Sequence, residues 1–290
     1  MLFDLQSPGR RRVIKVIYGS LAVLMGGGLV FFGIGGDASG GLSEIFTGGG
    51  SDVEEQFEDQ IEDAENRVAE NPNDAAAQAE LVQLYYQVGN DQLEIDEETG
   101  QQRFTSDAQE SYTKAANAWD RYVKLSKGKP DSSTALLAVQ TYSALANGAL
   151  TAAAQGGGQE ALDSADDSLT FFESAGEAQR TIADQGGNPD DLASVAQFLY
   201  FAGDFGAGDA AAQEAIAAAK GGQRSQIQRQ LEQVEKQARR LNDEIETFRN
   251  QLAKAGAQGG GEATGENPLS DLGGGGALGG SGGGGALATP

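Results

Sequence analysis

The longest apolar run of the chain lies close to its start. Residues 16–36 contain no charged side chain, and four basic residues stand between positions 10 and 15. Since an α-helix rises about 1.5 Å per residue, a run of this length can cross the roughly 30 Å hydrocarbon layer of a membrane. Basic residues beside a membrane helix stay in the cytoplasm, so the rest of the chain is expected on the other side.

This pattern predicts a cytoplasmic tail over residues 1–12 and a transmembrane helix over residues 13–36, which meets the lipid through Val16–Ile34. The alternative is a secretory signal that is cleaved, because such a signal also begins with positive charge and continues into an apolar core. Signal cores usually run to about 7–15 residues. The run here is longer, so an uncleaved anchor is the prediction.

Beyond a glycine-rich linker, residues 37–52, the apolar pattern becomes helical. Apolar residues recur at steps of three or four from Val53 to Val68, the period of one face of an amphipathic helix. Apolar-rich segments bounded by Gly, Pro, Asp or Asn predict further helices over Ala75–Val88, Ser106–Lys127, Ser133–Ala154, Gln159–Ala183, Asp190–Ala202, Gly208–Lys220 and Gln223–Ala255. The sequence therefore predicts an all-α fold with one helical domain over residues 53–255.

Three short proline motifs divide this domain. Pro72, Pro130 and Pro189 lie 58 and 59 residues apart, and an Asn or Asp directly follows each of them. Proline ends a preceding helix, and Asn or Asp caps a following one, so each motif marks the start of a new unit. A period of this kind predicts a stacked helical-repeat array, a solenoid.

One segment inside the first unit departs from the helical pattern. Residues 92–105 alternate apolar and polar side chains around Gly100, which predicts a β-hairpin. The alternative is a calcium loop, although the spacing of the acids departs from the twelve-residue pattern of such loops. Its ligands would be Asp91, Glu94, Asp96, Glu97 and Glu98.

The last predicted helix, residues 223–255, carries a heptad pattern over four heptads. Its apolar positions are Ile227, Leu231, Val234, Ala238, Leu241, Ile245, Phe248 and Leu252. One hypothesis is a coiled coil that pairs two copies of the chain into a homo-oligomer. The other is a long terminal helix whose apolar stripe covers the end of the solenoid. Residues 256–290, with 15 glycines, are predicted to form a disordered tail.

The chain is strongly acidic. It holds 43 acidic and 20 basic residues, a net charge of −23. Residues 37–290 carry 42 acidic and 16 basic residues, a net charge of −26. A field of this sign repels nucleic acid, so no nucleic-acid partner is expected, whereas cationic segments of proteins are attracted.

The absence of His and Cys from the sequence excludes whole classes of chemistry. Triads built on His or Cys, the usual zinc sites and disulfides all need these residues. We therefore expect no enzyme activity, with no catalytic residue, no cofactor and no metal. The remaining enzyme alternative is hydrolysis of envelope glycans by two carboxyl groups that face each other across a cleft. Asp163, Asp166 and Asp167 cluster on one predicted helix, although such a run is typical of a solvated face.

The helix pairs resemble tetratricopeptide repeats. In the first unit the step from Pro72 to Gly89 is seventeen residues, as in the family. The family's core positions are filled there by Gln78, Leu81, Val82 and Tyr85. The third unit holds Gly203-Asp204-Phe205 where the family has a Gly-Asp-Tyr turn. The period of 58–59 residues exceeds the family's 34, so helices or loops are lengthened in this chain.

This resemblance implies a tetratricopeptide-like solenoid with a concave surface that binds a protein or peptide. The family's partner-facing positions fall on Ala76, Ala79, Gln83, Tyr86, Gln87, Gln197, Tyr200 and Phe201. The whole layout is similar to bacterial single-pass membrane proteins with tetratricopeptide-like domains, some of which assist at the protein translocation channel. It implies a place in the bacterial inner membrane, with the N-terminus cytoplasmic and the repeats extracytoplasmic.

The function implied by this layout is a non-enzymatic interaction scaffold that assists secretory-protein translocation or envelope assembly. The strong acidity adds that the natural partner is a cationic or unfolded secretory client. The alternatives are a structural envelope protein that self-associates through the heptad helix, and the glycan hydrolase described above.

Overall fold

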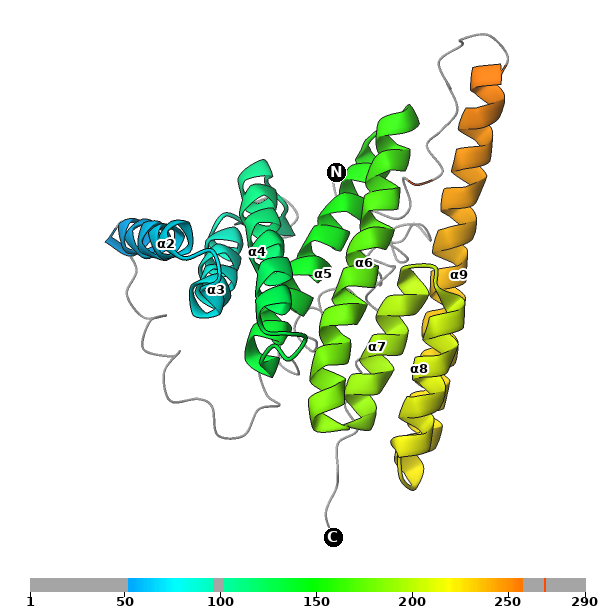
Figure 1. Cartoon of the computed structure of the whole chain (residues 1–290). Coiled ribbons are helices and arrows are strands. Elements are labelled where there is room, and N and C mark those ends of the chain that lie inside the picture. The colour runs from blue at the N-terminus through cyan, green and yellow to red at the C-terminus, as the bar shows by residue number, and fades with distance from the viewer. Residues whose placement is uncertain (1–51, 96–101, 258–268, 270–290) are drawn as a thin grey trace, which may run out of the picture. The chain divides into compact units, whose positions relative to one another are not determined.

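The computed structural model describes residues 52–95, 102–257 and 269 (Figure 1). In these ranges the chain is helical apart from one short β-ladder, which confirms the predicted all-α class. The helices are α2 (Asp52–Glu70), α3 (Ala75–Asp91), α4 (Ser106–Leu125), α5 (Ser132–Gln155), α6 (Gly158–Gly186), α7 (Pro189–Phe201), α8 (Phe205–Ala218) and α9 (Gly222–Ala257). Each helix predicted over 53–255 is present, with bounds that differ by a few residues.

The predicted membrane helix over 13–36 and its cytoplasmic tail over 1–12 lie outside the described residues. No helix in the described part of the chain is both long and apolar enough to cross a membrane. Most of the predicted tail, 256–290, is likewise outside the description. Leu269, which is described, is fully buried, so the tail takes part in packing at this position.

Successive helices pack against one another along the chain, from α2 on α3 to α7 on α8. The last helix, α9, packs on α6, α7 and α8. Contacts between alternate helices join α3 to α5 and α7 to α9. This succession of packed helices, visible in Figure 1, is compatible with a helical-repeat array.

The proline motifs start helices as predicted. The side chains of Asp74 and Asp131 accept hydrogen bonds from Ala77 N and Thr134 N, each at 2.9 Å, and so cap α3 and α5. The third motif departs from the prediction: the cap of α7 is Asn188, which precedes Pro189, and the proline lies in the first helical turn. Each such cap stabilises a helix by about 0.5–2 kcal/mol because it satisfies an otherwise unpaired N–H group.

Two glutamines join helix ends: Gln185 links the end of α6 to the start of α5, and Gln223 links the start of α9 to the start of α7. Gln185 Nε2 donates to the Pro130 carbonyl at 2.9 Å, and Gln223 Nε2 donates to Asp190 Oδ2 at 3.2 Å. These bonds connect residues 55 and 33 positions apart in the chain. The motifs at Pro130 and Pro189 therefore lie at the same edge of the helical domain.

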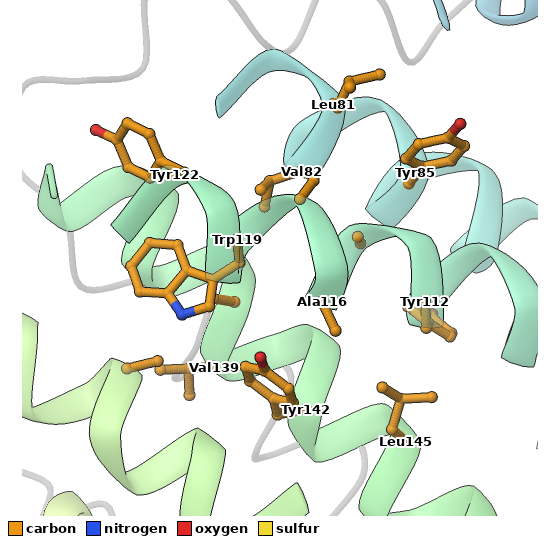
Figure 2. Close-up of a cluster of buried hydrophobic side chains, with 14 of the residues drawn as sticks. Leu81, Val82, Tyr85, Tyr112, Ala116, Trp119, Tyr122, Val139, Tyr142 and Leu145 are labelled. Atoms are coloured by element: carbon orange, nitrogen blue, oxygen red, sulfur yellow. The ribbon is translucent and has the colours of Figure 1, made fainter. Parts of the chain in front are cut away.

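Large side chains from α3, α4 and α5 meet in one core (Figure 2). Trp119 and Tyr122 of α4 lie with ring centroids 5.9 Å apart, between Val82 of α3 and Val139 of α5. Alanines at fully buried positions, such as Ala115, let the helices approach closely enough for these rings to interlock. Burial of this apolar surface holds the first two units together.

The apolar stripe of α9 is buried inside the same chain. The exposed fraction is 5% or less for Ile227, Leu231, Val234, Ala238, Leu241, Ile245 and Phe248. Because α6, α7 and α8 cover these side chains, they are not available to a second copy. The hypothesis of a covering terminal helix is confirmed, and a coiled coil through this stripe is wrong.

The predicted hairpin is confirmed. Strands β1 (Glu94–Ile95) and β2 (Gln102–Arg103) pair antiparallel, with Glu94 opposite Arg103, and these two side chains form an ion pair. Phe104, next to β2, stacks on Tyr112 of α4 with ring centroids 5.7 Å apart. Of the proposed calcium ligands, Asp96, Glu97 and Glu98 lie outside the described residues.

The close approach of α8 to α7 predicts the effect of one substitution. A Cβ at Gly208 would lie 2.5 Å from the ring of Tyr200, which is 2% exposed and cannot move aside, whereas a Cβ at Gly206 makes ordinary contact. The free energy of unfolding of Gly208→Ala should therefore be about 1–3 kcal/mol lower than that of Gly206→Ala, because overpacking displaces a buried ring. Urea unfolding of the two full-length variants measures this difference, and both variants carry the same Gly→Ala change near the start of α8. Equal stability would contradict the packing described here.

Candidate protein-interaction surface

A hollow of about 370 Å³ lies between α2, α3 and α4, and we refer to it as the α2–α4 hollow. Ile61 of α2, with Tyr85 and Val88 of α3, supplies apolar surface to its lining. A hollow of mixed apolar and charged lining suits a side chain or a short segment of another protein.

Carboxylates from two helices line this hollow. Helix α2 supplies Glu58, Glu62 and Glu65, whose steps of four and three place them on one helical face. The first turns of α4 add Asp107 and Glu110. The five acids are spread along the hollow, and the described residues contain no group of three or more acids close enough to hold a metal ion. The arrangement therefore suits an extended cationic surface better than a single ion.

Tyr85 connects the two acidic sides. Its hydroxyl donates to Glu65 Oε1, and Lys114 Nζ lies 5.6 Å from the centre of its ring. Burial, followed by the hydrogen bond to Glu65, raises the pKa of the Tyr85 phenol well above its usual 10.0. Lys114 also pairs with Glu110 at 2.8 Å and lowers the pKa of that carboxyl group. The Glu110 carboxylate therefore stays ionised near neutral pH.

The five partner-facing positions predicted on α3 do not line this hollow. Ala76 is exposed, whereas Ala79, Gln83, Tyr86 and Gln87 are half-buried. The ring of Tyr86 lies 6.0 Å from that of Tyr112, at the edge of the core. These residues share a different face of α3 from Tyr85 and Val88, so the hollow is a separate surface.

In the third unit, two of the three predicted positions are corrected. Tyr200 and Phe201 are 2% and 1% exposed, and Gln197 is half-buried. The hydroxyl of Tyr200 donates to Asp209 Oδ1 at 2.9 Å, and the ring of Phe201 lies 5.4 Å from Phe172 of α6. These aromatic side chains are core residues because α6, α8 and α9 pack over α7.

Of the three acids considered for glycan hydrolysis, two are exposed to solvent and the third pairs with an arginine. Asp163 and Asp167 are exposed on α6, and Asp166 forms an ion pair of 2.5 Å with Arg249 of α9. Burial raises the pKa of a different carboxyl, Asp191 at the start of α7, with a smaller contribution from the charge of Asp190. Gln179 lies 3.5 Å from Asp191, at the junction of α6 and α7.

Several buried tyrosines pair with carboxylates, as Tyr85 does. Tyr122 donates to Asp131 at 2.6 Å and Tyr142 donates to Asp120 at 2.8 Å. Burial is the largest cause of a raised phenol pKa at each of the six described tyrosines, which are Tyr85, Tyr86, Tyr112, Tyr122, Tyr142 and Tyr200. A raised pKa in the folded state links their ionisation to unfolding.

This linkage predicts loss of stability in alkali. Above pH 10.0 an unfolded tyrosine loses its proton while Tyr142 in the folded chain keeps it, so the unfolded state binds fewer protons. The free energy of unfolding is therefore fully retained below that pH and falls as the pH rises above it. Urea unfolding at about pH 9 and about pH 11 measures the fall. The Tyr142→Phe variant should lose less stability between these two values than the unaltered chain, and an equal loss would contradict the linkage.

Comparisons with protein-family models, with curated proteins and with solved structures find no match to this chain. The resemblance to tetratricopeptide repeats therefore rests on the residues of the sequence and on the packing of the helix pairs.

Proposed function

We propose that this chain is a non-enzymatic interaction scaffold whose α2–α4 hollow binds a cationic segment of a protein partner. The observation that carries the proposal is the lining of the hollow, in which five carboxylates accompany apolar side chains and a single ammonium group. Lys and Arg side chains of an amphipathic segment would pair with these carboxylates, while its apolar side chains would cover Ile61 and Val88.

The arrangement of the helices supports a binding role. Stacked helix pairs present extended surfaces to partners, and we propose that the pairs α3–α4 and α7–α8 are tetratricopeptide-like, each contacting the next odd-numbered helix. The charge of the hollow argues in the same direction. A catalytic acid needs a raised pKa, whereas Lys114 lowers the pKa of Glu110.

We further propose that residues 13–36 tether this scaffold to the outer side of a bacterial inner membrane. The uncharged run and the basic residues before it support this placement. A scaffold in this position would meet secretory proteins as they leave the translocation channel, or envelope proteins as they assemble. A client that exposes cationic and apolar side chains together suits the hollow.

Photocrosslinking in intact cells tests the proposed binding role. A photoreactive residue in place of the exposed Glu62, at the hollow, should capture protein partners. The same probe in place of Glu173, which is exposed on α6, is the matched control and should not capture them. Crosslinks to secretory precursors or to the translocation channel would support a translocation role, and one dominant envelope protein would support assembly.

A charge change within the hollow sharpens this test. Glu58→Lys and Asp107→Lys, introduced together in the chain that carries the probe at position 62, should abolish capture because they repel a cationic segment. Capture that persists unchanged in this variant would refute the proposed role of the hollow.

Thiol labelling tests the proposed topology, because the chain has no cysteine of its own. In intact cells a membrane-impermeant maleimide should label Glu173→Cys in the helical domain. Asp4→Cys, in the proposed cytoplasmic tail, should be labelled after the membrane is permeabilised. Labelling of position 4 in intact cells, with position 173 protected, would contradict the proposed orientation.

A further inference from the structure

Charge is distributed unevenly along the helical array. Helix α2 holds nine acidic residues and one basic residue, a net charge of −8. Helix α9 holds seven basic and five acidic residues, a net charge of +2, in a chain whose net charge is −23. The first and last described helices therefore differ in the sign of their charge.

Three cations of α9 form a stripe on its outer face. Arg229, Lys236 and Arg240 are all exposed, and steps of seven and four residues place them on one side of the helix. This side is opposite the buried stripe that includes Leu231 and Ala238, so it faces away from the array. Within the described part of the chain, none of the three forms an ion pair. We refer to them as the α9 stripe.

Other basic residues of α9 have roles inside the fold. Arg249 pairs with Asp166 of α6, and Arg224 donates to the carbonyl groups of Ile216 and Ala219. Arg239 lies 4.1 Å above the ring of Phe205. The α9 stripe is therefore distinct from the cations that hold α9 in place.

The α9 stripe and the α2–α4 hollow are complementary in charge and can be occupied together. The hollow presents Glu58, Glu62 and Glu65 along one helical face. The three cations of the stripe share their side of α9 with two exposed acids, Glu232 and Asp243, so that side keeps a net charge of +1. Helix α2 packs on α3 at the start of the array, whereas α9 packs on α6, α7 and α8 at its end. Occupation of one surface thus leaves the other open.

We infer that the α9 stripe of one copy docks on the α2–α4 hollow of a second copy, so that copies associate head to tail. This inference rests on the proposed function, because it names a cationic segment that the hollow accepts. Such a contact is heterologous, so it leaves an open stripe at one end and an open hollow at the other, and it builds rings or filaments. Because the charges are exposed, salt weakens the association.

Cysteine crosslinking tests this contact, since the chain has no cysteine to interfere. Full-length Glu62→Cys and full-length Lys236→Cys, mixed in detergent and treated with a short bismaleimide, should give a linked pair. Neither variant alone should link to itself, because the contact joins two different surfaces. Glu173→Cys in place of Lys236→Cys is the matched control and should give no product. Linkage of Glu62→Cys to itself, or no linkage of the mixed pair, would overturn the inference.

A charge exchange supplies a second, independent measurement. One variant carries Glu58→Lys and Glu62→Lys, and the other carries Lys236→Glu and Arg240→Glu. Each variant alone should lose self-association in sedimentation velocity, because its hollow and stripe are then no longer opposite in charge. An equal mixture should form pairs of one copy of each variant, since the unaltered stripe of the first variant meets the unaltered hollow of the second. Circular dichroism establishes that both variants are folded, and a mixture that stays monomeric would refute the contact.

The two proposals fail in different ways. If the cysteine pair does not link while the photoreactive residue at position 62 captures a different protein, head-to-tail association is wrong and the proposed scaffold function stands. If position 62 captures neither another protein nor a second copy, both proposals are wrong.

Discussion

Burial of one apolar face of each helix against the next helix is the interaction on which this structure depends. The chain has no cysteine, so no disulfide shares this role. An amphipathic helix cannot cover its own apolar stripe, and each unit of an array is stabilised by its neighbours. Fully buried alanines such as Ala77, Ala115 and Ala135 bring the helices close enough for Trp119 and the surrounding rings to pack between them.

The same constraint shapes the surface that we propose as functional. Once Ile61 and Tyr85 face the junction of α2, α3 and α4, the acids that flank them in sequence must border that junction as well. The acidic hollow is therefore a consequence of how amphipathic helices pack at one end of the array. At the other end, burial of the heptad stripe turns Arg229, Lys236 and Arg240 of α9 outward.

Part of this surface could be read from the sequence, and part could not. The steps from Glu58 to Glu62 and Glu65 are visible as one helical face, because such a face depends on spacing alone. The contribution of Glu110 could not be foreseen, since α4 follows an inserted hairpin and its rotation against α2 depends on packing. The prediction that Tyr200 and Phe201 face a partner is wrong because α7 is shorter than the corresponding helix of the first unit. Its residues are therefore rotated relative to that helix, and both aromatic rings face the core.

The sequence by itself determined the helices, because the apolar period, the proline motifs and the capping residues act within a few residues of each other. It also determined the hairpin, through alternation of side chains around a glycine. The tertiary structure alone decided which faces are buried, because this depends on which helix each stripe meets. The α9 heptads show the difference: their spacing permits a partner chain or the same chain, and contact with α6, α7 and α8 selects the same chain.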